Sequence, residues 1–104
     1  NNTVSRNYST GIMKSLEEHM TKEGYFYFDW NVDSGDTTYY TASEIVRYTI
    51  NQIDGRHSSV VLMHDIKSRT VEALKEIIRF GLENGYKFEA IDESTPRVQF
   101  RPSN

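Results

Sequence analysis

Residues 59–85 carry the sequence SVVLMHDIKSRTVEALKEIIRFGLENG, in which a short apolar run is followed by a helical pattern. The run at residues 59–63 predicts a buried strand that ends at His64. Ser68 is a candidate N-cap, and beyond it apolar side chains recur at helical spacing: Val71, Leu74, Ile77, Ile78 and Leu82. Gly85 lies beyond the predicted end of this helix. The stretch therefore predicts one strand–helix unit with polar residues at its junction.

A similar unit precedes this stretch. Residues 25–30 contain five aromatic side chains in six positions, which predicts a strand covered on both faces. Turn-forming residues follow at 33–36. Thr41 or Ser43 then opens a helix that ends at Gly55, and its expected inward face consists of Ile45, Val46, Thr49, Ile50 and Ile53.

The two ends of the chain carry weaker patterns. Residues 9–11 are expected to cap a helix that stops at Gly24 and buries one apolar face, made of Ile12, Met13, Leu16 and Met20. A short strand is predicted near residues 88–91, and an edge strand at residues 98–100 between two prolines.

Alternating helices and strands with short connections predict an α/β fold with parallel strands and right-handed crossovers. The 104 residues offer few strands for a closed barrel, so the order fits several βα units cut from a barrel. A net charge of −3 argues against nucleic-acid binding, which requires a basic surface. The sequence has no cysteine and no apolar run of the roughly 20 residues that span a bilayer.

Polar residues follow both central strands, where parallel sheets place their functional groups. Asp29 lies near the end of the aromatic run, Asn31, Asp33 and Asp36 follow it, and His64 follows the second strand. Histidine exchanges protons near neutral pH, and a carboxylate such as Asp36 beside it would favour the imidazolium. The alternative is a strand-end histidine satisfied by the main chain, with Asp36 serving only the turn. Residue pattern alone favours neither interpretation.

Other polar or aromatic residues carry weaker signals. His19 and His57 have no metal-ligand spacing to the histidine at position 64 and are interpreted as surface residues. Tyr39 and Tyr40 follow the acidic loop and are candidates either for stacking on a sugar ring or for packing the loop.

Two segments resemble motifs of the polysaccharide deacetylases, carbohydrate esterases that act on chitin, peptidoglycan and acetylated xylan. Residues 27–36, YFDWNVDSGD, resemble the fourth motif of that family. Residues 61–65, VLMHD, with the helical pattern behind them, resemble the fifth, and residues 85–88 resemble the strand that follows it. The residues of these motifs are most similar to those of peptidoglycan N-acetylglucosamine deacetylases of Gram-positive bacteria, and the resemblance covers nearly the whole chain.

The resemblance implies that residues 1–104 form the C-terminal half of a distorted (β/α) barrel with helices outside the parallel strands. Family members bind one divalent metal, zinc or cobalt, through an aspartate and two histidines of the first two motifs. Those motifs and the third have no counterpart in this sequence. No bound metal is therefore expected for this chain alone, and the metal is expected in the full-length parent.

The resemblance also implies roles for particular residues. His64 would be the general acid that protonates the leaving amine, and Asp36 would orient and tune it. Substrate-binding residues are expected at three positions: Leu62, which would line the acetyl pocket, Asp33 and Trp30. The family often has tryptophan where this chain has Thr37, so the acetyl pocket is expected to differ there.

The function expected from the resemblance is that of a fragment of a metal-dependent peptidoglycan N-deacetylase. The fragment would carry the general-acid side of the site and would be inactive alone. Its substrate would be peptidoglycan or a chitin-like polymer, and its location extracellular or at the cell surface. Open strand edges favour a homodimer or pairing with the missing N-terminal half. The alternatives are a non-catalytic sugar-binding or assembly module of the same fold and, last, a receiver-like phosphoacceptor domain.

Overall fold

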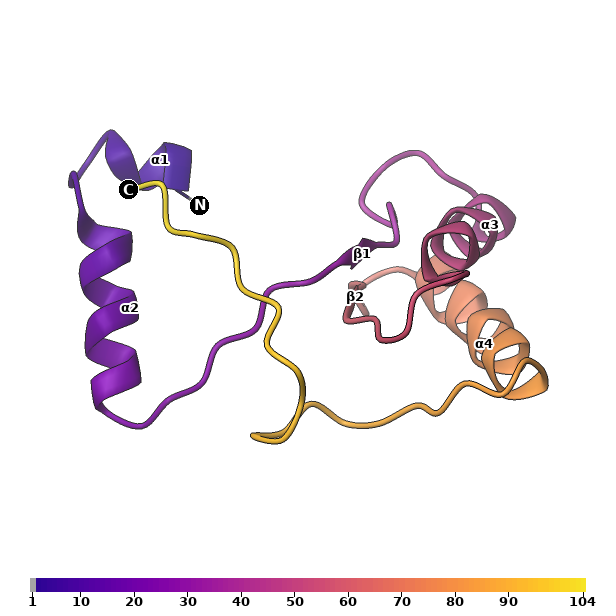
Figure 1. Ribbon diagram of the computed structural model, residues 1–104. Helices are drawn as coiled ribbons and strands as arrows, with labels where there is room; N and C mark the ends of the chain where they lie inside the picture. The colour runs from indigo at the N-terminus through magenta and orange to yellow at the C-terminus, as the bar shows by residue number, and fades with distance from the viewer. Residues whose placement is uncertain (1) are drawn as a thin grey trace. The chain divides into compact units, whose positions relative to one another are not determined.

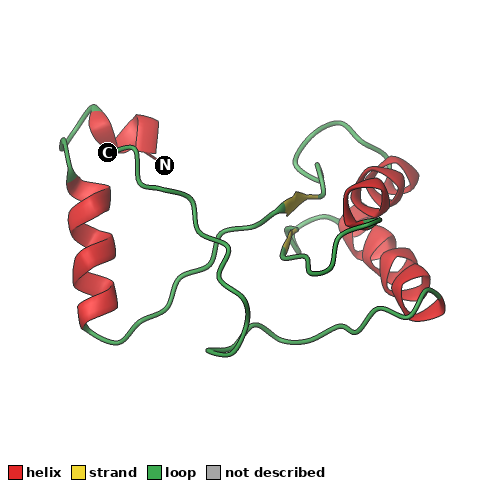
Figure 2. Cartoon of the chain, in the orientation of Figure 1, coloured by secondary structure: helices red, strands yellow, loops and turns green. Residues whose placement is uncertain are grey.

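The computed structural model describes residues 2–104, which divide into two compact units. The first unit extends to Asp29 and also includes Thr95–Asn104, and the second is Trp30–Ser94. The elements occur in the following order (Figures 1 and 2): α1 (Asn2–Arg6), α2 (Ile12–Lys22), β1 (Val32–Asp33), α3 (Ala42–Ile53), β2 (Val61–Leu62) and α4 (Ser68–Glu83). Among these described residues, no helix combines the length and the apolar character that a membrane crossing needs.

Strands β1 and β2 pair in parallel, with Val32 opposite Val61 and Asp33 opposite Leu62. The N–H of Ser34 donates to the carbonyl oxygen of Leu62 at 3.2 Å and continues this pairing past the end of β1. Helix α3 connects the two strands, as the alternation of elements predicts. The α/β class and the parallel pairing of the sequence prediction are confirmed.

The side of β1 that faces away from β2 is occupied by a side chain of α3. The Asp33 N–H donates to Gln52 Oε1 at 3.2 Å, and Gln52 Nε2 donates to the Asp33 carbonyl oxygen at 2.7 Å. Both main-chain groups of Asp33 are therefore satisfied by the carboxamide of Gln52.

The core of the second unit lies between the sheet and the two helices that lie side by side next to it (Figure 1), and consists of Val32, Ile45, Ile53, Ala73 and Ile77. Of the two predicted caps, Thr41 and Ser43, it is Thr41 that caps α3, because its hydroxyl accepts the N–H of Glu44 at 3.2 Å. The predicted inward face of α3 is confirmed at three positions that are buried: Ile45, Thr49 and Ile53.

The predicted inward face of α4 is wrong at three of its five positions. Val71, Leu74 and Leu82 are 45%, 41% and 64% exposed, whereas the buried residues of α4 are Thr70, Ala73, Ile77 and Gly81. Small residues allow close approach, and a Cβ at position 81 would lie 2.4 Å from the Phe88 ring. The predicted N-cap is also wrong, because Lys67 occupies the cap position and Ser68 is the first residue of the helix.

The aromatic run at residues 25–30 does not form the predicted strand. The strand begins later, at Val32, and Tyr25 and Phe26 are 61% and 58% exposed rather than covered on both faces. The run instead makes scattered contacts with the C-terminal segment of its own unit, including Asp29 N–H to the Val98 carbonyl oxygen at 2.6 Å. The guanidinium of Arg97 lies over Phe26, 4.2 Å from the ring centroid. Residues 88–91 and 98–100 also lack the strand structure predicted for them.

Helix α2 forms close to its predicted range but buries none of its residues. Its apolar side chains are partly exposed, with Leu16 at 47% and Met20 at 41%. The predicted cap at residues 9–11 supplies no side-chain hydrogen bond. Asn104 takes that role, since its side-chain oxygen accepts the Gly11 N–H at 2.7 Å and its main-chain oxygen accepts the Lys14 N–H at 2.9 Å.

Candidate functional site

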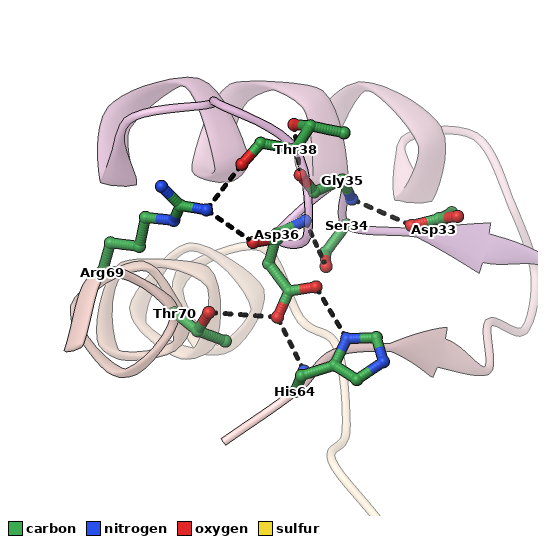
Figure 3. A network of polar contacts seen from close by, with 8 residues as sticks. All are labelled: Asp33, Ser34, Gly35, Asp36, Thr38, His64, Arg69 and Thr70. Carbon is green, nitrogen blue, oxygen red and sulfur yellow. Dashed lines mark hydrogen bonds and ion pairs between the residues drawn. The ribbon is translucent and has the colours of Figure 1, made fainter. Parts of the chain in front are cut away.

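The loop after β1 and the loop after β2 meet beside the first turn of α4 (Figure 3). Asp36 is 2% exposed, and its carboxylate connects the three elements. Oδ1 lies 2.9 Å from His64 Nδ1, and Oδ2 accepts the main-chain N–H of His64 at 2.6 Å. The Thr70 hydroxyl also donates to Oδ2, at 3.0 Å. The predicted pair of His64 and Asp36 is thus brought into direct contact.

The Asp36 carboxylate is ionised at neutral pH. Burial raises the pKa of Asp36, but hydrogen bonds outweigh burial and lower that pKa below its usual range, chiefly those from the ring and the N–H of His64 and from the Thr70 hydroxyl. An ionised carboxylate only accepts hydrogen bonds, so His64 Nδ1 must carry the proton between the two groups. The other ring nitrogen points away from Asp36 (Figure 3), and the His64 side chain is 42% exposed.

This arrangement can move a proton at one defined atom. A carboxylate that holds Nδ1–H fixes the ring orientation and stabilises the imidazolium. The exposed nitrogen, Nε2, is then the position from which a proton is given or taken. The pair fits general acid–base chemistry on a group that approaches from solvent.

The loop that carries Asp36 is held in place along its length. Asp33 Oδ1 accepts the Gly35 N–H at 2.9 Å, and Ser34 Oγ accepts the Asp36 N–H at 3.3 Å. From α4, Arg69 Nη2 donates to the carbonyl oxygens of Asp36, at 3.1 Å, and Thr38, at 2.5 Å. The position of the carboxylate is therefore set by local turns and by the start of α4.

Gly35 makes this loop sensitive to substitution. Its φ is +70°, and a Cβ there would lie 2.8 Å from the Tyr40 ring, which packs edge-on against Tyr48. Gly55 has a similar φ of +77° but open space around a Cβ, so Gly55→Ala isolates the backbone cost of about 1–2 kcal/mol. Gly35→Ala is expected to lose about 1–3 kcal/mol more, because the ring must move. Urea unfolding measures both, and equal losses would contradict the predicted clash.

The three predicted substrate-binding residues occupy different positions around this site. Asp33 and Leu62 are register partners in the sheet, the first exposed and the second half-buried. Trp30 is half-buried and precedes β1, whereas Asp36 follows it. Their binding roles stay predictions. Thr37, next to the buried carboxylate, is exposed.

Sequence reasoning gave Arg69 and Thr70 no role in the site. Both lie in the first turn of the helix that follows His64, where a surface or capping role is the usual expectation. A usable signal was present, because the first turn of a helix after a parallel strand lies at the same edge of the sheet as the strand end.

The residues described by the structure do not fit the metal that the resemblance implies. Across residues 2–104, no group of three or more histidine, cysteine, aspartate or glutamate side chains is placed to hold a metal ion. We therefore derive no chemical step through a metal from these residues.

Comparisons with known proteins find relatives that are all named as deacetylases. No family model matches the chain. The "Putative polysaccharide deacetylase YheN" of Bacillus subtilis is 35% identical over an alignment of 89 residues, and the match covers 80% of this chain and 31% of that protein. A peptidoglycan-N-acetylglucosamine deacetylase of Bacillus cereus is 30% identical over an alignment of 91 residues, and the match covers 82% of this chain and 33% of that protein.

A solved structure resembles the chain over almost its full length. It is the crystal structure of the catalytic domain of a peptidoglycan N-acetylglucosamine deacetylase from Eubacterium rectale, with a TM-score of 0.92 and 39% sequence identity. The match covers 97% of this chain and 47% of that one. The chain thus spans about a third of the length of the curated relatives and about half of the solved domain.

Proposed function

The chain belongs to the polysaccharide deacetylase family, and from that membership we propose that it supplies the proton-donating side of an N-deacetylase active site. The observation that carries the proposal is the buried Asp36 carboxylate, which holds the Nδ1 side of a His64 ring that is 42% exposed. The proposed substrate is peptidoglycan or a chitin-like polymer, whose N-acetyl groups are hydrolysed to acetate and free amine.

In the proposed reaction, water adds to the acetyl carbonyl, and the bond between the carbonyl carbon and the nitrogen then breaks. The departing amine needs a proton, which His64 would give from Nε2 while Asp36 keeps its hold on Nδ1–H. Asp36 fixes the direction of Nε2 during the transfer, because it holds Nδ1–H on the other side of the ring. The proton thus passes from the imidazolium to the amine, and the ring is left neutral.

We further propose that the chain forms part of a distorted (β/α) barrel, and that Leu62 lines the acetyl pocket with Asp33 and Trp30 on the substrate side. The expected zinc or cobalt ion would be held by residues of the parent enzyme other than those described. A divalent metal of this kind would supply water activation and polarise the carbonyl. The proposed location is extracellular or at the cell surface, where the polymer is found.

Residues 1–104 alone are expected to release no acetate from N-acetylglucosamine oligomers, even with added zinc or cobalt, because the described residues lack a metal site. The matching measurement uses the catalytic domain that contains this sequence, which is expected to release acetate in a metal-dependent reaction.

Turnover by the 104-residue chain would contradict the proposal that this chain carries only the proton-donating side of the active site. Absence of turnover by the whole domain, together with saccharide binding by the chain, would replace the proposal with a non-catalytic sugar-binding module.

A further inference from the structure

We propose that Thr70 is a positioning residue, which holds the Asp36 carboxylate in the one orientation that lets it bind the His64 ring. This inference rests on the proposed function for its kinetic consequence only. Its structural basis is the hydrogen bond from the Thr70 hydroxyl to Asp36 Oδ2 at 3.0 Å, seen in Figure 3 on the side of the carboxylate opposite the ring.

The two oxygens of the carboxylate have different partners. Oδ2 accepts two hydrogen bonds, from the His64 N–H at 2.6 Å and from the Thr70 hydroxyl at 3.0 Å. Oδ1 faces His64 Nδ1 at 2.9 Å. Since Asp36 is ionised, the Thr70 hydroxyl can act only as a donor toward it. Two donors on Oδ2 fix the carboxylate plane, and that plane decides where Oδ1 points.

Thr70 is itself firmly placed. It is 3% exposed in the first turn of α4, and its N–H donates to the Lys67 carbonyl oxygen at 3.1 Å. Its neighbour Arg69 binds the carbonyl oxygens of Asp36 and Thr38. At the start of α4, Arg69 therefore holds the main chain of the loop, and Thr70, the next residue, orients the Asp36 carboxylate.

Loss of the Thr70 hydroxyl would remove this constraint. The terminal torsion of an aspartate side chain is broad, so a carboxylate with one donor fewer can rotate. Rotation moves Oδ1 away from Nδ1, and the ring then no longer has a single preferred tautomer. A ring that Asp36 no longer holds can turn aside, and its Nε2 then no longer lies where a leaving amine can take the proton.

Three variants test the proposal in the catalytic domain that contains this sequence. Thr70→Val removes the hydroxyl at nearly constant shape, and Thr70→Ser keeps it. Thr49→Val is the matched control, because Thr49 is also fully buried and its hydroxyl has no hydrogen-bond partner within residues 2–104. The two readouts are steady-state kinetics on N-acetylglucosamine oligomers and nitrogen-15 NMR of the His64 ring.

Thr70→Val is expected to lower kcat by about tenfold, the equivalent of one hydrogen bond to a charged group, with KM little changed. Thr70→Ser should restore most of kcat, and Thr49→Val should leave it unchanged. The ring nitrogens should show Nδ1–H in the parent and in Thr70→Ser, and a mixture of tautomers in Thr70→Val.

The proposal is overturned if Thr70→Val keeps both the parental kcat and the parental tautomer. It is also overturned if Thr70→Ser loses as much as Thr70→Val, or if Thr49→Val loses the same. A catalytic domain that releases no acetate would remove the proposed function instead, and the NMR tautomer would still decide whether Thr70 positions the pair.

Discussion

Replacing His64 by alanine in the proposed full-length deacetylase is expected to lower kcat by about 10²- to 10⁴-fold, the usual contribution of a general acid. KM should change far less, because proton donation to the leaving amine belongs to the transition state rather than to substrate binding. Acetate release measured over a range of oligomer concentrations separates the two constants.

The matched control is His57→Ala, since His57 is an exposed histidine outside the Asp36 network. It should leave both constants close to those of the parent. His64→Ala removes the ring that donates to Asp36 Oδ1, so urea unfolding of each variant is needed to show that the domain stays folded at the assay temperature. An unchanged kcat in a folded His64→Ala variant would exclude His64 from the mechanism.

Replacing Asp36 by asparagine is expected to reduce the free energy of unfolding by about 3 kcal/mol at neutral pH, because hydrogen bonds to a charged group are lost. The carboxylate accepts from His64 Nδ1, the His64 N–H and the Thr70 hydroxyl, and an asparagine must turn its NH₂ group toward some of these donors. The site is 2% exposed, so water cannot replace them without rearrangement.

The destabilisation should depend on pH in a defined direction. The pKa of Asp36 is lowered from its ordinary value of 3.8, so the stabilisation by the carboxylate is complete above about that pH and is lost as pH falls through the folded-state pKa. The difference in the free energy of unfolding between the parent and Asp36→Asn should therefore be large at neutral pH and small in acid. The control is Asp54→Asn at an exposed position, expected to change little at any pH. A gap that widens in acid would contradict the lowered pKa.

The pairing of Asp36 with His64 could be predicted because it follows from a general property of parallel sheets. Both residues come just after strands, and the carboxyl ends of adjacent parallel strands lie together. The cap of α3 at Thr41 could be predicted for a similar reason, since a hydroxyl side chain before a helical pattern has one common local use.

The elements that were predicted wrongly depend on tertiary packing. The buried face of α4 contains Ala73 and Gly81, which a count of large apolar side chains passes over. Because small residues allow close packing, the buried face of α4 lies about one residue earlier in the sequence than the predicted face. Residues 25–30 have high strand propensity, but a strand also needs a partner along its length, and propensity carries no information about partners.

The role of Thr70 was not predicted, because its signal lies in the topology of the sheet rather than in the local sequence. A threonine in the first turn of a helix usually serves its own helix, so nothing local indicates a carboxylate 34 residues away in sequence. Its contact exists only once the start of α4 and the loop after β1 lie at the same end of the sheet.

The carboxamide of Gln52 prevents the outer side of β1 from offering free main-chain groups at Asp33. An uncovered strand edge offers free N–H and carbonyl groups that can recruit a strand from another molecule, a common first step of aggregation. At Asp33 both groups are already bound by one side chain from the last turns of α3. An incoming strand would have to break both of these hydrogen bonds before it could form its own at that residue. Helix α3 thus hinders a strand of another molecule from pairing with β1 at Asp33.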